Sequence, residues 1–161
     1  YQNIKPAYEL MEWILENRNN KYKFYTSQLA MSEIFHALDE EYKCRRMRKD
    51  GVPLSAWSNA KNKFKLSEDD INDIMDEMGL FEHLFIDKRI KLLKEKFSFA
   101  HIIPLVLDFG IRTHDAILLS TAFLNKCNYF VTHDKELIDK KLKIIKVVHS
   151  RILNEVLNKR F

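Results

Sequence analysis

The sequence predicts an α/β fold with a mainly parallel central sheet. Segments with helical periodicity alternate with short apolar runs such as Tyr129–Val131 and Lys143–Val148, which is the pattern of βαβ units. Only three glycines and three prolines occur, which indicates few long loops and a high helix content. At 161 residues, 46% of them hydrophobic, the chain is long enough to bury a sizeable core. We therefore expect one domain spanning residues 1–161.

Composition narrows the class of protein. Charged residues make up 31% of the chain, no run of about 20 apolar residues occurs, and no signal-peptide pattern opens the sequence. Cys44 and Cys127 are far apart and lack the spacing of a zinc site or a disulfide framework. These features predict a cytoplasmic globular protein. A formal charge of +4 permits nucleic-acid binding without demonstrating it.

The N-terminal part reads as helix, strand and helix. Apolar residues recur with helical spacing over Ala7–Asn17, and Lys21–Tyr25 alternates and is rich in aromatic residues, as a strand would be. A second helix is predicted from Leu29 to Arg46. It places the acidic residue Glu33 within its first two turns.

Residues 45–96 form a highly charged region in which helices are expected. Gly51 and Pro53 end the preceding helix. Ser67 is a predicted N-cap, with Asp70 at the capping-box position, and Gly79 is expected to end that helix. Its apolar stripe is expected in the core and consists of Ile71, Ile74, Met75 and Met78. A basic helix is predicted over about Asp87–Lys96.

The same region contains a concentration of basic residues. Five of the eight residues in Tyr42–Lys49 are Lys or Arg, and further lysines alternate with Trp57 and Phe64. One interpretation is a solvated helix face; the other is contact with RNA phosphates and stacking on bases. The candidate RNA-binding residues are Arg45, Arg46, Arg48, Lys49, Lys61 and Lys65.

The most informative stretch runs from Ile111 to Lys140. Ser98–Phe109 is predicted helical and Gly110 closes it, after which Thr113 is a plausible N-cap with Asp115 in the first turn of the next helix. Tyr129–Val131 reads as a short buried strand, followed directly by Thr132, His133 and Asp134. In open α/β sheets ligands bind at this carboxyl end of the strands.

Glu33, Asp115 and Asp134 share one position type, just after a strand or early in the helix that follows. Right-handed βαβ connections can bring such positions to one sheet edge, where neighbouring carboxylates repel unless a cation lies between them. Oxygen ligands alone favour Mg²⁺ or Mn²⁺ over zinc. Each acid also has a plainer interpretation: Asp134 as a helix cap, Asp115 as a partner of the helix dipole, and Glu33 as a solvated residue. His114 and His133 are interpreted as surface or packing residues.

Three segments, SEIFHAL around Glu33, THDAILLSTA around Asp115 and YFVTHDKEL around Asp134, together resemble the PIN-domain family. The likeness covers the Glu33 helix and about Phe99–Lys159. It implies a three-layer α/β/α fold with a mainly parallel central sheet. Residues 45–96 depart from the family, because they are longer and more charged than a minimal PIN domain needs, and we expect a helical insertion there. The resemblance also implies that Glu33, Asp115 and Asp134 are catalytic and metal-binding residues for Mg²⁺ or Mn²⁺, with Thr132 orienting ligands or phosphate.

By the same resemblance the expected function is a metal-dependent endoribonuclease, as in the VapC-type toxins of toxin–antitoxin pairs. An antitoxin partner and a homodimer are expected on that ground alone. PIN domains open with a strand that ends in an aspartate, and no such strand precedes Ala7, so we expect a further N-terminal segment. Two rival functions stay open: a non-catalytic RNA-binding PIN domain in an RNA-processing or ribosome-maturation complex, and a DNA-directed nuclease.

Overall fold

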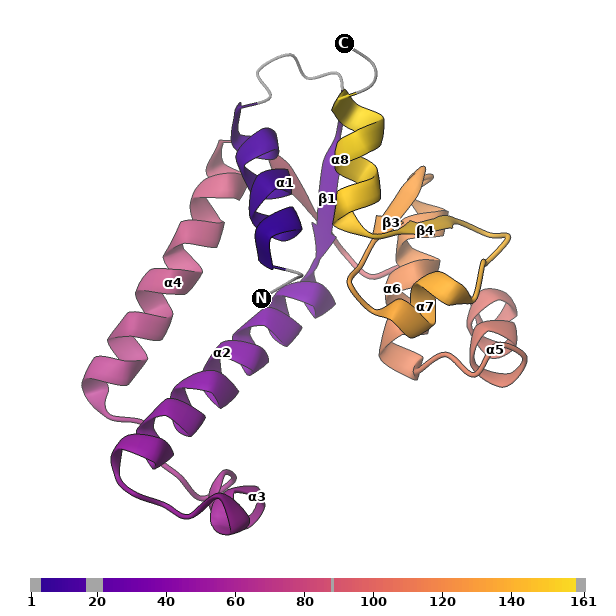
Figure 1. Ribbon diagram of the computed structural model, residues 1–161. Coiled ribbons are helices and arrows are strands. Elements are labelled where there is room, and N and C mark those ends of the chain that lie inside the picture. The colour runs from indigo at the N-terminus through magenta and orange to yellow at the C-terminus, as the bar shows by residue number, and fades with distance from the viewer. Residues whose placement is uncertain (1–3, 17–21, 88, 159–161) are drawn as a thin grey trace. The chain divides into compact units, whose positions relative to one another are not determined.

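The computed structural model describes residues 4–16, 22–87 and 89–158, and shows a mixed helix and strand fold (Figure 1). The chain divides into two compact units. The first comprises Tyr1–Leu29 and Lys91–Phe161, and the second comprises Ala30–Ile90. Among the described residues no helix is both long enough and apolar enough to cross a membrane.

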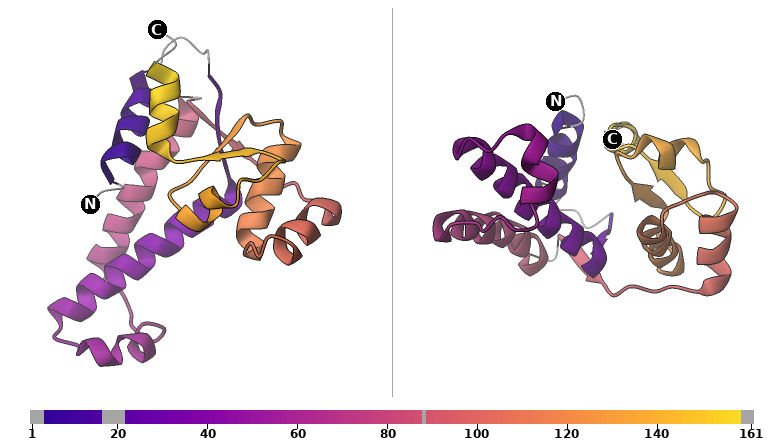
Figure 2. Two further views of the ribbon diagram at one scale, coloured as in Figure 1. Left: turned by 45° about the vertical axis from the view of Figure 1, so that its right-hand side comes forward. Right: turned by 90° about the horizontal axis from the view of Figure 1, so that it is seen from below.

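The first unit holds most of the secondary structure elements. Helices α1 and α8 lie side by side in it, and α6 packs against both α5 and β3 (Figures 1 and 2). Its elements are α1 (Ile4–Glu16), β1 (Phe24–Ser27), β2 (Ile90–Leu93, which starts at the last residue of the second unit), α5 (Phe99–Leu107), α6 (Thr113–Leu124), β3 (Tyr129–Val131), α7 (Lys135–Asp139), β4 (Lys146–Val148) and α8 (Ser150–Asn158).

The strands pair in two separate two-stranded sheets, β1 with β2 and β3 with β4. β3 and β4 are parallel, with Tyr129 opposite Lys146 and Val131 opposite Val148. The predicted strand Tyr129–Val131 is confirmed residue for residue, whereas the strand expected over Lys143–Val148 is shorter. The first predicted strand lies later than expected, at Phe24–Ser27, and Lys21 falls outside the described residues.

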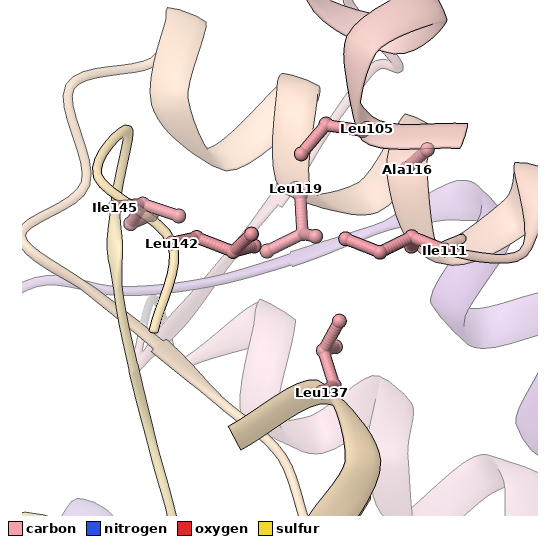
Figure 3. Packing of buried hydrophobic residues seen from close by; sticks show 7 residues of the cluster. All are labelled: Leu105, Ile111, Ala116, Leu119, Leu137, Leu142 and Ile145. Carbon is pink, nitrogen blue, oxygen red and sulfur yellow. The ribbon is translucent and has the colours of Figure 1, made fainter. Parts of the chain in front are cut away.

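Helix α6 is the centre of the core of this unit. Its residues Ala116 and Leu119 have no exposed surface, and apolar side chains from α5, α7 and the loop before β4 surround them (Figure 3). The cluster consists of Leu105, Ile111, Ala116, Leu119, Leu137, Leu142 and Ile145. The chain enters α6 through Gly110, whose φ of +62° is a conformation that residues with a Cβ rarely adopt.

Two polar side chains fix the segment between β2 and α5. Thr121 Oγ1, on the buried side of α6, accepts a hydrogen bond from Lys96 N at 3.0 Å and donates one to Lys96 O at 3.1 Å. The neighbouring Glu95 carboxylate accepts from Leu29 N, and the surrounding donors lower the pKa of Glu95. Helices leave their first N–H groups without intrahelical partners, so Glu95 caps the helix that begins at Gln28.

The second unit is a helical hairpin. Helix α2 (Gln28–Lys49, of which all but the first two residues belong here) and α4 (Glu68–Ile86) are joined through η1 (Leu54–Ala56) and α3 (Trp57–Ala60). The two long helices run in opposite directions, since Tyr42 Oη donates to Glu77 while Arg46, further along α2, pairs with Asp70 earlier in α4. The predicted capping box is confirmed: Ser67 and Asp70 satisfy one another at the start of α4.

Three predictions for this region are wrong. α4 continues through Gly79 to Ile86, because one glycine in a helix interior costs only about 1 kcal/mol and good helix formers follow it. Of its apolar stripe only Ile74 is buried, whereas Ile71 and Met75 are 47% and 66% exposed. The basic helix expected over 87–96 is the strand β2 and adjoining loop, because β-favouring Ile90–Leu93 pairs with β1.

Candidate functional site

Asp115 and Asp134 lie together in the first unit and share one positive charge. Arg112 Nε donates to Asp115 Oδ2 at 2.9 Å, and an Arg112 terminal nitrogen donates to Asp134 Oδ2 at 3.2 Å. Arg112 is the N-cap residue of α6, so the predicted cap, Thr113, is wrong by one position. Two of the three predicted acids, Asp115 and Asp134, therefore converge where α6 begins and β3 ends. Asp134 lies 22 residues after Arg112 in the sequence.

The turn after β3 fixes the backbone of Asp134. Thr132 N donates to Val148 O at 3.0 Å, which extends the pairing of β3 with β4. Thr132 Oγ1 then accepts from Asp134 N at 3.1 Å. Asp134 Oδ1 accepts from Leu137 N at 3.2 Å and so caps α7, while Oδ2 faces Arg112. The predicted capping role of Asp134 is confirmed. The cap uses only one of its two carboxylate oxygens, Oδ1.

His133 lies beside this turn and contacts the start of α8. Its Nε2 is 2.8 Å from the Oγ of buried Ser150, and its ring stacks on His149 at a centroid distance of 4.5 Å. Burial, and secondarily the neighbouring His149, lowers the pKa of His133 below its ordinary value. The packing role expected for His133 is confirmed, because its ring joins the end of β3 to the end of β4.

Glu33 lies on the second turn of α2, exposed to solvent, in the second unit. It therefore belongs to a different unit from Asp115 and Asp134. Among the described residues, no three His, Cys, Asp or Glu side chains are grouped as a metal site would group them. The geometry available for chemistry is that of the two aspartates around Arg112.

The charge balance at this pair is governed by Arg112. Its side chain is 79% exposed, whereas those of Asp115 and Asp134 are 20% and 32% exposed. The hydrogen bond to Asp115, followed by the charges of the nearby acids, raises the pKa of Arg112. Asp115 also lies in the first turn of α6, where the helix dipole favours an anion.

The ligand type of Asp115 and Asp134 is suited to a divalent cation. Both donors are carboxylates, the ligands that Mg²⁺ and Mn²⁺ prefer. Their Oδ2 atoms already gather around a single positive group, the Arg112 guanidinium, which occupies the position of a shared cation. A metal ion held by these oxygens would have to displace or neighbour Arg112.

The predicted RNA-binding residues lie in the second unit, and three of the six have acidic partners. Arg45 pairs with Glu41, Arg46 with Asp50 at 3.5 Å, and Lys61 with Glu40 at 2.5 Å. The other three, Arg48, Lys49 and Lys65, are exposed. Half of these basic residues are thus paired with acids, two of them with a residue four positions away, which is the arrangement expected of a solvated helix face.

Arg112 is the residue that sequence reasoning missed. Its spacing of three residues before Asp115 was a readable local signal for a pair on one helix face. Its second partner, Asp134, comes from another element and leaves no local signal.

No protein-family model matches the chain, and no curated protein matches it either. The assignment of a function therefore rests on the geometry of the site.

Proposed function

We propose that the chain is a metal-dependent endoribonuclease with a PIN-like three-layer α/β/α fold that works in the cytoplasm. The proposal places Asp115 and Asp134, together with Glu33, as the catalytic and metal-binding acids. The observation that carries it is the convergence of the two aspartates on one positive group from elements distant in sequence. Surface ion pairs add little stability, so a three-member cluster at the end of a strand favours a functional role.

Each residue has a distinct part in this proposal. Mg²⁺ or Mn²⁺ held by carboxylates lowers the pKa of a bound water and stabilises negative charge on a phosphate. Thr132 holds the Asp134 backbone, and the α7 cap holds one of its carboxylate oxygens, so the second oxygen has a fixed direction. Arg112, largely exposed, keeps donors that can bind a phosphate oxygen.

The test is cleavage of a labelled structured RNA by the full-length chain with Mn²⁺ and with EDTA. We expect cleavage only with Mn²⁺ and a loss of about hundredfold or more in Asp115→Asn. Asp108→Asn is the matched control, since Asp108 is an exposed acid at the end of α5, and it should cleave like wild type. Full activity of Asp115→Asn would eliminate the proposal. Single-stranded DNA of the same sequence, run in parallel, tests the DNA-directed alternative.

A second candidate function is an RNA-binding module without catalysis. It is favoured by Arg112, which satisfies both aspartates with no metal ion. Mn²⁺ titration of wild type and Arg112→Ala separates the two candidates. In a nuclease, removal of the competing guanidinium should tighten Mn²⁺ binding. In a binding module neither protein takes up Mn²⁺, and RNA is bound but not cut. An antitoxin partner and a homodimer remain proposals that rest on the family resemblance.

A further inference from the structure

Helix α4 presents an apolar stripe to solvent. Ile71, Met75 and Ile86 are 47%, 66% and 64% exposed. Their spacing returns them to one side of the helix, next to buried Ile74. An amphipathic helix usually has one apolar side; α4 has a buried one, which includes Ile74 and Leu84, and an exposed one beside it.

The same helix is strongly acidic, although the whole chain carries a net charge of +4. Seven of its residues are Asp or Glu and none is Lys or Arg. Asp70 and Glu77 serve the hairpin, through Ser67 and Tyr42. The others are exposed, and no ion pair is found for them among the described residues; they are Glu68, Asp69, Asp73, Asp76 and Glu82.

The acids and the apolar stripe form one surface. Glu68 and Glu82 lie three residues before Ile71 and four before Ile86, so they occupy the stripe itself. Asp76 follows Met75 and flanks it on the solvent side. The stripe from Ile71 to Ile86 is about 22 Å long at the helical rise per residue. This is the length of four turns of a facing helix.

We propose that this outer face of α4 docks a basic amphipathic helix of a partner protein. Apolar side chains of the partner would cover Ile71, Met75 and Ile86, and its Lys or Arg residues would meet the acids beside them. A second copy of α4 would set acids against acids, and RNA would meet the same repulsion. The inference is independent of the proposed nuclease activity, which uses residues of neither the stripe nor its acids.

The probe is a synthetic helical peptide of about 21 residues with Leu at heptad core positions and Lys at the flanking positions. It is titrated into the full-length chain and binding is followed by fluorescence anisotropy. We expect saturable binding that weakens several-fold between about 0.1 and 0.5 M salt. A peptide with Glu in place of Lys should bind at least tenfold more weakly.

Three variants locate the site. Met75→Lys should weaken peptide binding at least tenfold, and Asp76→Lys, a surface charge reversal that leaves packing intact, several-fold. The matched control is Ile103→Lys on α5, since Ile103 is 50% exposed in an apolar helix without acids, and it should bind like wild type. Circular dichroism of each variant confirms its fold. Equal binding of the Glu peptide, or equal loss in Ile103→Lys and Asp76→Lys, would overturn the proposal. So would a Met75-dependent dimer that excludes the peptide.

Discussion

The edge formed by α6 and β3 and the helix α2 differ in the kind of ion pair that predominates. Three ion pairs of α2 join residues four apart: Asp39 with Lys43, Glu41 with Arg45, and Arg46 with Asp50. Two others reach a second element, Glu40 with Lys61 at 2.5 Å and Arg46 with Asp70 at 3.9 Å. At the edge, Arg112 joins acids from two elements. Pairs of the first kind follow from helix geometry alone and support the helix weakly. Pairs of the second kind exist only because the fold creates them, so they are the better guide to function.

The largest effect should come from the core that positions this edge. Leu119→Ala removes a side chain with no exposed surface from the centre of the cluster, and should lower the free energy of unfolding by about 3 kcal/mol. Met75→Ala, in exposed surroundings on α4, should change it by less than about 0.5 kcal/mol. Urea denaturation of both variants measures the contrast. Equal effects would mean that Leu119 is not central to the core.

The two oxygens of Asp134 can be separated by substitution. Asn caps helices as well as Asp, so Asp134→Asn should keep the α7 cap and stability, yet lose about hundredfold in RNA cleavage. Asp134→Ala should lose both the activity and about 1 kcal/mol of stability. Cleavage rates measure the loss of activity in the two variants, and thermal melts measure their loss of stability. Normal cleavage by Asp134→Asn would leave Asp134 with its capping role alone.

Glu95 makes a pH-dependent contribution to the stability of the first unit. Its backbone donors, Leu29 N foremost, lower the pKa of Glu95 below the ordinary 4.5. Folding therefore favours the charged form, and the stabilisation is complete above pH 4.5 and lost as pH falls through the lowered pKa. Glu95→Gln should lower stability by about 1 kcal/mol at neutral pH and have little effect near about pH 2. A difference that persists undiminished at low pH would show that the charge is irrelevant.

The smallest effect is expected for a pair within α2. Arg45 and Glu41 are both more than half exposed, so Arg45→Ala should cost no more than about 0.5 kcal/mol. If Arg45 contacts RNA, the variant should still weaken RNA binding, and more so at low salt. Filter binding at two salt concentrations beside a thermal melt separates these effects. A loss of stability above about 1 kcal/mol would remove the distinction between the two kinds of pair.

Local chemistry explains which predictions succeed. The strand Tyr129–Val131, the Ser67 capping box and the end of the helix before Gly51 are confirmed, since each depends on neighbouring residues. Gly79 misled because the surrounding helix outweighs one glycine. The strand at Ile90–Leu93 was read as helix because its pairing with β1 is not visible locally.

In the candidate site, too, the features that depend on neighbouring residues were predicted and those that depend on tertiary contacts were not. Asp115 in the first turn of α6 and Asp134 after β3 were placed correctly from the sequence, because strand ends and helix starts carry local signals. The link through Arg112 was not foreseen, because it joins residues 22 apart. The burial of Ile74 rather than Met75 was also beyond the periodicity, which gives a stripe but not which edge of it is covered.

The connection between the parallel strands β3 and β4 contains one short helix, α7. Tyr129 therefore lies opposite Lys146, only 17 residues later. Parallel pairing normally carries a large loss of chain entropy on closure, and this short crossover keeps that loss small. Contacts of such low sequence separation form early in folding. We therefore expect the turn that carries Asp134 to be organised in the folding transition state, so that core substitutions in this segment slow refolding more than they accelerate unfolding.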